Sequence, residues 1–66
     1  MLNVMESNDH LRGLHININE GRELVYWSYV LQCEQNDLIN AVLKIGTSAK
    51  MVDDFLILNR LKLPKE

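Results

Sequence analysis

Apolar residues along most of this chain recur with a helical period, in three segments separated by polar interruptions. The first segment predicts a helix over residues 19–31, with Asn19 as its N-cap. Its core stripe consists of Leu24, Trp27 and Leu31, widened by Tyr26, Val30 and Cys33. Most of this helix is therefore expected to be buried.

Two further helices follow the polar stretch QCEQND. The second has a core stripe of Leu38, Ala41, Val42 and Ile45. Gly46 should end it, because glycine readily takes the left-handed conformation that closes a helix, and Thr47 or Ser48 can cap the next one. The third core stripe is Val52, Phe55, Leu56 and Asn59. Pro64 limits the extension of this helix.

The segment LHININ, residues 14–19, differs from the rest because apolar and polar residues alternate in it. Alternation predicts an extended segment whose two faces differ. Leu14, Ile16 and Ile18 would face the core, and His15, Asn17 and Asn19 would face outward.

These elements predict an all-α fold, a small three-helix domain preceded by a mobile N-terminal arm and a short extended segment. We assign residues 1–13 to the flexible arm, 14–63 to the single domain with its extended lead-in 14–19, and 64–66 to a C-terminal tail. Sixty-six residues are near the lower limit for burying a sufficient core.

Composition narrows the class of protein. The chain is 47% hydrophobic and 24% charged, with three Gly and one Pro, which indicates a globular domain rather than a disordered one. The formal net charge of -2 is unlike the basic excess of most nucleic-acid binders. Acidic residues predominate before Leu38, and basic residues predominate after it. This polarity could orient a partner or a second copy of the chain.

The single cysteine, Cys33, cannot form an intramolecular disulfide, and the start of the sequence does not resemble a secretion signal. No apolar run approaches the roughly 18 residues of a membrane-spanning helix. We therefore expect a cytoplasmic protein with no membrane partner.

Candidate chemistry is sparse. Asp9, His10, His15 and Cys33 are metal-ligand types, but their spacing matches no known zinc pattern, so we expect neither a metal nor a cofactor. Nucleophilic catalysis would need Cys33 or a serine beside a histidine, and so small a chain has little room for a substrate pocket. We expect no enzyme activity and no small-molecule substrate.

Several short motifs occur at fixed spacing. They are Ile18-Asn19, Glu23-Leu24-Val25-Tyr26-Trp27, Leu38-Ile39-Asn40-Ala41-Val42, Gly46, Ser48 and Val52. In these motifs the chain, over about residues 16–56, resembles a family of short bacterial proteins known as domain of unknown function 3606. The resemblance implies a compact helical module with no assigned activity, and it carries over no catalytic residues.

The chain departs from the family pattern in two ways. Between the first two helices it has Gln32-Cys33-Glu34 where the family usually has Gly-Val-Ser. Gln32 must then adopt a conformation that suits glycine, and Glu34 is a poorer N-cap than serine, so this turn should be weak. Leu43 and Met51 stand where the family tends to have charged or polar residues.

Surplus apolar residues outside the core stripes suggest an interaction surface. The candidate interface residues are Tyr29, Leu43, Met51, Ile57, Leu58 and Leu61. From them we predict a non-catalytic module that binds another protein or itself, with a homodimer as one form.

A DNA-binding regulator is the alternative. In outline, an extended segment followed by two helices resembles a ribbon-helix-helix repressor, with His15, Asn17 and Asn19 facing the bases and Arg22 beside them. The second and third helices could instead form a helix-turn-helix, with Lys50 on its exposed side. Both interpretations meet the same difficulty, because acidic residues lie near the surface that would approach phosphate.

Overall fold

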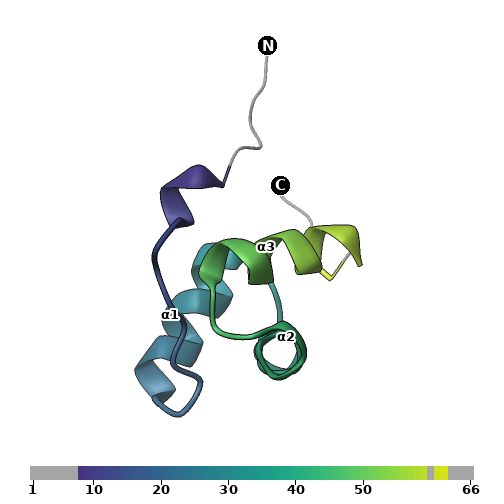
Figure 1. Cartoon of the computed structure of the whole chain (residues 1–66). Helices are drawn as coiled ribbons and strands as arrows, with labels where there is room; N and C mark the ends of the chain where they lie inside the picture. The colour runs from purple at the N-terminus through teal and green to yellow at the C-terminus, as the bar shows by residue number, and fades with distance from the viewer. Residues whose placement is uncertain (1–7, 60, 63–66) are drawn as a thin grey trace.

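The computed structural model describes residues 8–59 and 61–62. Within these residues the chain forms one turn of 3-10 helix, η1 (Asp9–Leu11), and three α-helices, α1 (Gly21–Leu31), α2 (Gln35–Ile45) and α3 (Ala49–Leu58). In Figure 1, α3 runs across the front, α1 lies behind it, and α2 is seen almost along its axis. The predicted all-α, three-helix fold is confirmed.

The core lies where α2 packs against both α1 and α3. Buried apolar residues come from every helix and from the segments before α1. They are Leu11, Ile16, Trp27, Leu31, Cys33, Leu38, Ala41, Val42, Ala49, Val52 and Leu56. The predicted core positions of α1 and α2 are confirmed, except that Tyr26 is 57% exposed. On α3, Asn59 is wrongly predicted as a core residue, since it is the exposed C-cap and its side chain donates to the Phe55 carbonyl.

The start of α1 lies one residue later than predicted. Glu20, not Asn19, is the N-cap, and its side chain makes no capping hydrogen bond. A tight turn precedes it, in which the Asn17 side-chain oxygen accepts from the Asn19 N–H at 3.0 Å. The Asn17 N–H in turn donates to Glu23 Oε1 at 3.1 Å. Asn17 therefore organises the entry into α1, because a short amide side chain readily closes such a turn.

The connection from α1 to α2 has the two weaknesses expected from the sequence. Gln32 is left-handed, with φ 56° and ψ 61°, and among the described residues it is the one non-glycine residue with positive φ. Glu34 is the N-cap of α2, and its side chain accepts no capping hydrogen bond.

The connection from α2 to α3 is better formed. Gly46 ends α2 as predicted, although its φ of 106° and ψ of -171° combine positive φ with an extended ψ rather than the left-handed helical conformation. Ser48 is the N-cap of α3, and its hydroxyl accepts from the Met51 N–H at 3.4 Å.

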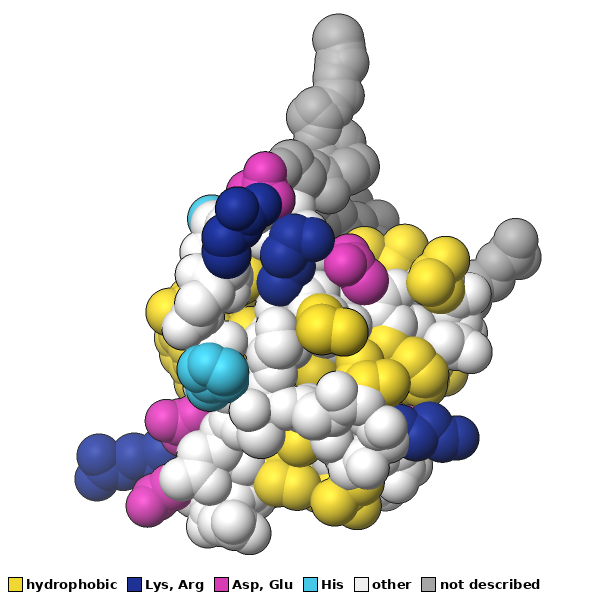
Figure 2. Space-filling model, viewed as in Figure 1, with side chains coloured by type: hydrophobic (Ala, Val, Ile, Leu, Met, Phe, Trp, Pro, Cys, Tyr) yellow, Lys and Arg dark blue, Asp and Glu magenta, His cyan; other side chains and the backbone are white. Residues whose placement is uncertain are grey.

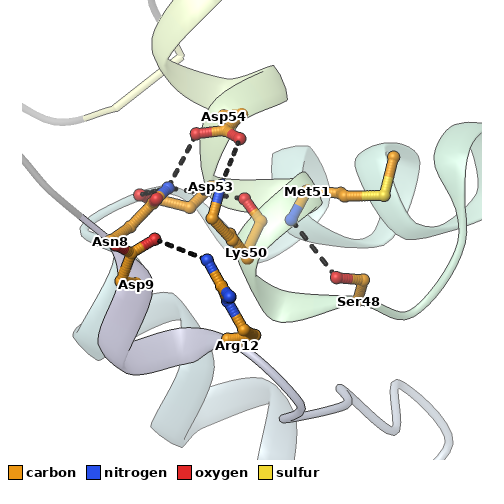
Figure 3. Close-up of polar contacts among 8 residues, drawn as sticks. All are labelled: Asn8, Asp9, Arg12, Ser48, Lys50, Met51, Asp53 and Asp54. Carbon is orange, nitrogen blue, oxygen red and sulfur yellow. Dashed lines mark hydrogen bonds and ion pairs between the residues drawn. The ribbon is translucent and has the colours of Figure 1, made fainter.

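Residues 8–13 are packed on the domain, which differs from the flexible arm expected over residues 1–13. Leu11 is only 3% exposed and belongs to the core. The Asn8 side-chain amide donates to Asp53 Oδ2 at 2.9 Å and to Asp54 Oδ1 at 2.7 Å (Figure 3). A buried apolar side chain and an amide that donates to one buried and one half-exposed carboxylate thus hold η1 against α3. The remainder of the predicted arm, 1–7, lies outside the described residues.

The extended segment is shorter than predicted. Its backbone pairs with the start of α3, where Ile16 N–H donates to the Thr47 carbonyl at 2.9 Å and Ala49 N–H donates to the Leu14 carbonyl at 3.0 Å. Ile16 is buried and Ile18 packs on the core as expected, but Leu14 is 45% exposed. The segment therefore serves mainly to anchor Ile16.

Candidate functional site

Most of the large apolar side chains that remain exposed lie on two separate parts of the surface. One is the outer side of α1, which carries Val25, Tyr26 and Tyr29. The other is formed by α3 and α2, with Met51 and Leu58 on α3 and Leu43 on α2. Of these residues, Val25 was not predicted as a surface residue, and Tyr26 was wrongly placed on the core stripe of the first helix.

On α3 the exposed apolar residues do not all share a direction. Met51, Phe55 and Leu58 follow the i, i+4, i+7 spacing of one helical face. Phe55 is half-buried against the core, while Leu58 is 82% exposed. Ile57 lies about 100° around the helix from Leu58 and belongs to a different side. The predicted interface set is therefore divided by the structure.

Next to this stripe, a groove of about 460 Å³ runs between α2 and the end of α3. Its lining is mixed apolar and polar, and consists of Asp37, Asn40, Leu43, Lys44, Phe55, Asn59 and Leu61. We call these residues, together with Met51 and Leu58, the α2–α3 face. Figure 2 shows hydrophobic side chains gathered over α3 and below it toward α2.

Leu61 is less exposed than the sequence suggested. After α3 the chain turns back, and the Leu61 N–H donates to the Leu56 carbonyl at 2.9 Å. Leu61 then packs against the core from the floor of the groove. Of the six predicted interface residues, Leu43, Met51 and Leu58 thus lie on the α2–α3 face together with a partly buried Leu61. Tyr29 and Ile57 lie elsewhere.

The outer side of α2 carries two opposite charges. Asp37 is in the first turn and Lys44 in the last, and neither side chain forms a hydrogen bond or ion pair with any other residue that the structure describes. The exposed Asn40 lies between them on the same line. These three residues thus form a polar line with a charge at each end, and this line is one side of the groove.

The residues predicted to contact nucleic acid come together only in part. His15 and Arg22 line a shallow hollow with Leu14, Glu23, Tyr26 and Trp27. His15 Nδ1 lies 3.0 Å from Thr47 Oγ1, and Asn17 is used in the turn before α1. Lys50 is on α3, where its amine lies 3.5 Å from Asp54 Oδ2. One edge of the extended segment is occupied by residues 47–49, and the turn at Asn17 ends the segment after a few residues.

A buried polar cluster around Asp53 was not predicted. Asp53 is 5% exposed, and its carboxylate accepts from Asn8 at 2.9 Å and from Lys62 Nζ at 2.6 Å. These partners come from segments before α1 and after α3, so the cluster fastens both to α3. The available signal was an acidic residue directly next to the core stripe on α3.

Cys33 is buried, and its burial together with the nearby negative charge of Asp37 raises the pKa of the thiol to about 11. The thiol is therefore protonated at neutral pH and weakly nucleophilic.

Within the part of the chain that the structure describes, no three His, Cys, Asp or Glu side chains are grouped to hold a metal ion. Nor is any helix in that part long and apolar enough to cross a membrane.

Comparison with known proteins gives one match. The family model described as "Protein of unknown function (DUF3606)" matches residues 14–56, which include α1, α2 and most of α3. No curated protein and no solved structure matches the chain.

Proposed function

The chain belongs to the DUF3606 family, whose function is unknown, and we propose that it is a non-catalytic module that binds protein through the α2–α3 face. The bound protein is either another chain or a second copy of this one. The observation that carries the proposal is the stripe of Met51, Phe55 and Leu58 beside a groove that also holds Leu43.

The energetic argument rests on how these side chains are grouped. Single exposed apolar residues are ordinary on protein surfaces, whereas several on one face next to a groove favour association. Leu58 is 82% and Leu43 is 72% exposed, so both have most of their apolar area left to bury. Covering a leucine fully contributes about 1.5–3 kcal/mol. Two such residues would form the centre of a modest interface.

The non-catalytic part of the proposal is supported by the state of Cys33. The thiol is the strongest inherent nucleophile among the side chains, yet it is buried and its pKa is raised to about 11. A single buried cysteine also suits a reducing compartment, so we include the cytoplasm in the proposal.

Sedimentation of the purified protein, together with capture from a bacterial lysate, tests the proposal. The double variant M51K/L58K should lose association or capture while its far-ultraviolet circular dichroism stays unchanged. I57K is the control for one added lysine, to be compared with L58K alone, because Ile57 is exposed on another side of α3. A wild-type protein that stays monomeric at high micromolar concentration and captures nothing would contradict the proposal.

A DNA-binding regulator is a second candidate, and one observation favours it. His15 and Arg22 line the same shallow hollow as Tyr26, which places a guanidinium and an imidazole beside an aromatic ring, with Glu23 as an acidic neighbour. NMR titration with mixed duplex DNA at low salt tests it. Chemical-shift changes confined to this hollow would support the candidate, and a spectrum without changes would exclude it.

A further inference from the structure

We infer that the partner on the α2–α3 face is a second copy of this chain, with the two α2 helices antiparallel across a two-fold axis near Asn40. This inference rests on the proposed function and names its partner. It is carried by the distribution of charge along α2.

Three residues define the contact line on α2. Asp37, Asn40 and Lys44 follow i, i+3, i+7 spacing and therefore share one side of the helix. All three also line the groove, so this side of α2 borders the α2–α3 face. The two charged members are about 10 Å apart along the axis, at 1.5 Å per residue.

An antiparallel copy of α2 matches this line. A two-fold axis between residues 40 and 41 brings Asp37 of one chain opposite Lys44 of the other, and the symmetry produces the same pair twice. Asn40 then lies close to its own copy, where each amide can both donate and accept a hydrogen bond. A parallel arrangement would instead oppose like charges at both ends. In the antiparallel arrangement the two helix dipoles also point in opposite directions, which is electrostatically favourable.

The state of the charged residues in the single chain supports this pairing. Neither Asp37 nor Lys44 has an ion-pair partner among the described residues, whereas Lys50 and Lys62 are paired with Asp54 and Asp53. Within the described part of the chain, both charges on the contact line therefore lack an ion-pair partner of their own. Leu43, which is 72% exposed beside them, supplies apolar area to the same contact.

Charge reversal gives a sharp test by sedimentation equilibrium. K44E and D37K should each weaken self-association about tenfold, because each replaces two exposed ion pairs with two like-charge contacts. The double variant D37K/K44E should recover the wild-type association constant, since every pair is restored with its signs exchanged. An equimolar mixture of K44E and D37K should also associate, because the mixed dimer contains two opposite-charge pairs.

R22E is the matched control, since Arg22 is exposed on α1 and the change in charge equals that of K44E. Circular dichroism checks that each variant folds. If the single variants weaken association and the double variant does not restore it, the antiparallel pairing is wrong. A wild-type monomer that captures a lysate protein through Met51 and Leu58 would show that the partner is not a second copy. It would leave the proposed function intact. A monomer that captures nothing would overturn both.

Discussion

The two connections between helices have the same length, but only one of them has residues that suit its backbone conformation and its capping position. Gln32, Cys33 and Glu34 join α1 to α2, and Gly46, Thr47 and Ser48 join α2 to α3. In each connection the first residue has positive φ and the last is an N-cap. In the second connection these positions are glycine, which tolerates a positive φ, and serine, which is a good N-cap. In the first connection they are glutamine and glutamate. The glutamine backbone is strained by its positive φ, and the glutamate makes no capping hydrogen bond.

Tertiary contacts hold the weaker connection in place. Cys33 is buried in the core, and its N–H donates to the Ser28 carbonyl at 3.0 Å. Cys33 also forms an isolated antiparallel bridge with Lys62, from the segment after α3. Residues that suit a connection poorly are thus tolerated where the chain between them is anchored in the core. Substitutions at the two connections can measure this balance.

The largest effect is expected at Gly46. The variant G46A should lower the free energy of unfolding by about 2 kcal/mol, because a φ of 106° with an extended ψ is strained for any residue with a Cβ atom. A Cβ built at Gly46 meets no atom within 4 Å, so the cost would come from the backbone alone. Urea denaturation measures it. G21A is the control and should leave stability equal or higher, since Gly21 has no positive φ and equal space.

Removal of the Ser48 cap, the one side-chain N-cap among the described helices, should have the next largest effect. S48A is expected to lower the free energy of unfolding by about 1 kcal/mol, because the Met51 N–H loses its acceptor. S48D keeps a capping oxygen and should remain near the wild-type midpoint in urea. Equal losses for the two variants would show that the cap contributes nothing.

A substitution that improves the connection between α1 and α2 should raise the free energy of unfolding. Q32G is expected to raise the free energy of unfolding by about 0.5–1 kcal/mol, as relief of strain at φ 56° exceeds the added entropy of the unfolded chain. It should also slow the labelling of Cys33 by thiol reagents, if labelling requires this connection to open. Q35G, inside the first turn of α2, is the control and should destabilise. A destabilised Q32G would mean that the strain at Gln32 is negligible.

The smallest effect is expected at Glu34. E34S should raise the free energy of unfolding by about 0.5 kcal/mol by providing the capping oxygen that α2 lacks. E34A provides none and should show no gain in the same urea experiment. A gain of equal size in both variants would assign the effect to the charge rather than to the cap.

The sequence predicted those features that depend on residue patterns within one segment, such as the core positions of a helix. Leu38, Ala41 and Val42 are buried as their spacing indicated, and the strain at Gln32 followed from its place in the family pattern. Contacts between distant segments could not be read in this way. Asn8 reaches Asp53 and Asp54 across more than 40 residues of sequence, so nothing local to Asn8 indicated its burial.

The candidate surface was predictable to a similar degree. Leu43, Met51 and Leu58 were expected to be exposed and are. Leu61 was not expected to pack on the core, because its burial depends on the chain turning back after α3. The separation of Ile57 from Leu58 follows from helical geometry once the helix and its core side are known.

The Asp53 cluster bears on where the independently folding unit begins and ends. The two donors to this buried carboxylate, Asn8 and Lys62, both lie outside the 14–56 segment matched by the family. A fragment cut to the matched segment would keep every residue of α1 and α2 but would lose both donors to the Asp53 carboxylate and the segments that carry them. The unit to express for structural or binding work is therefore residues 8–62 at least.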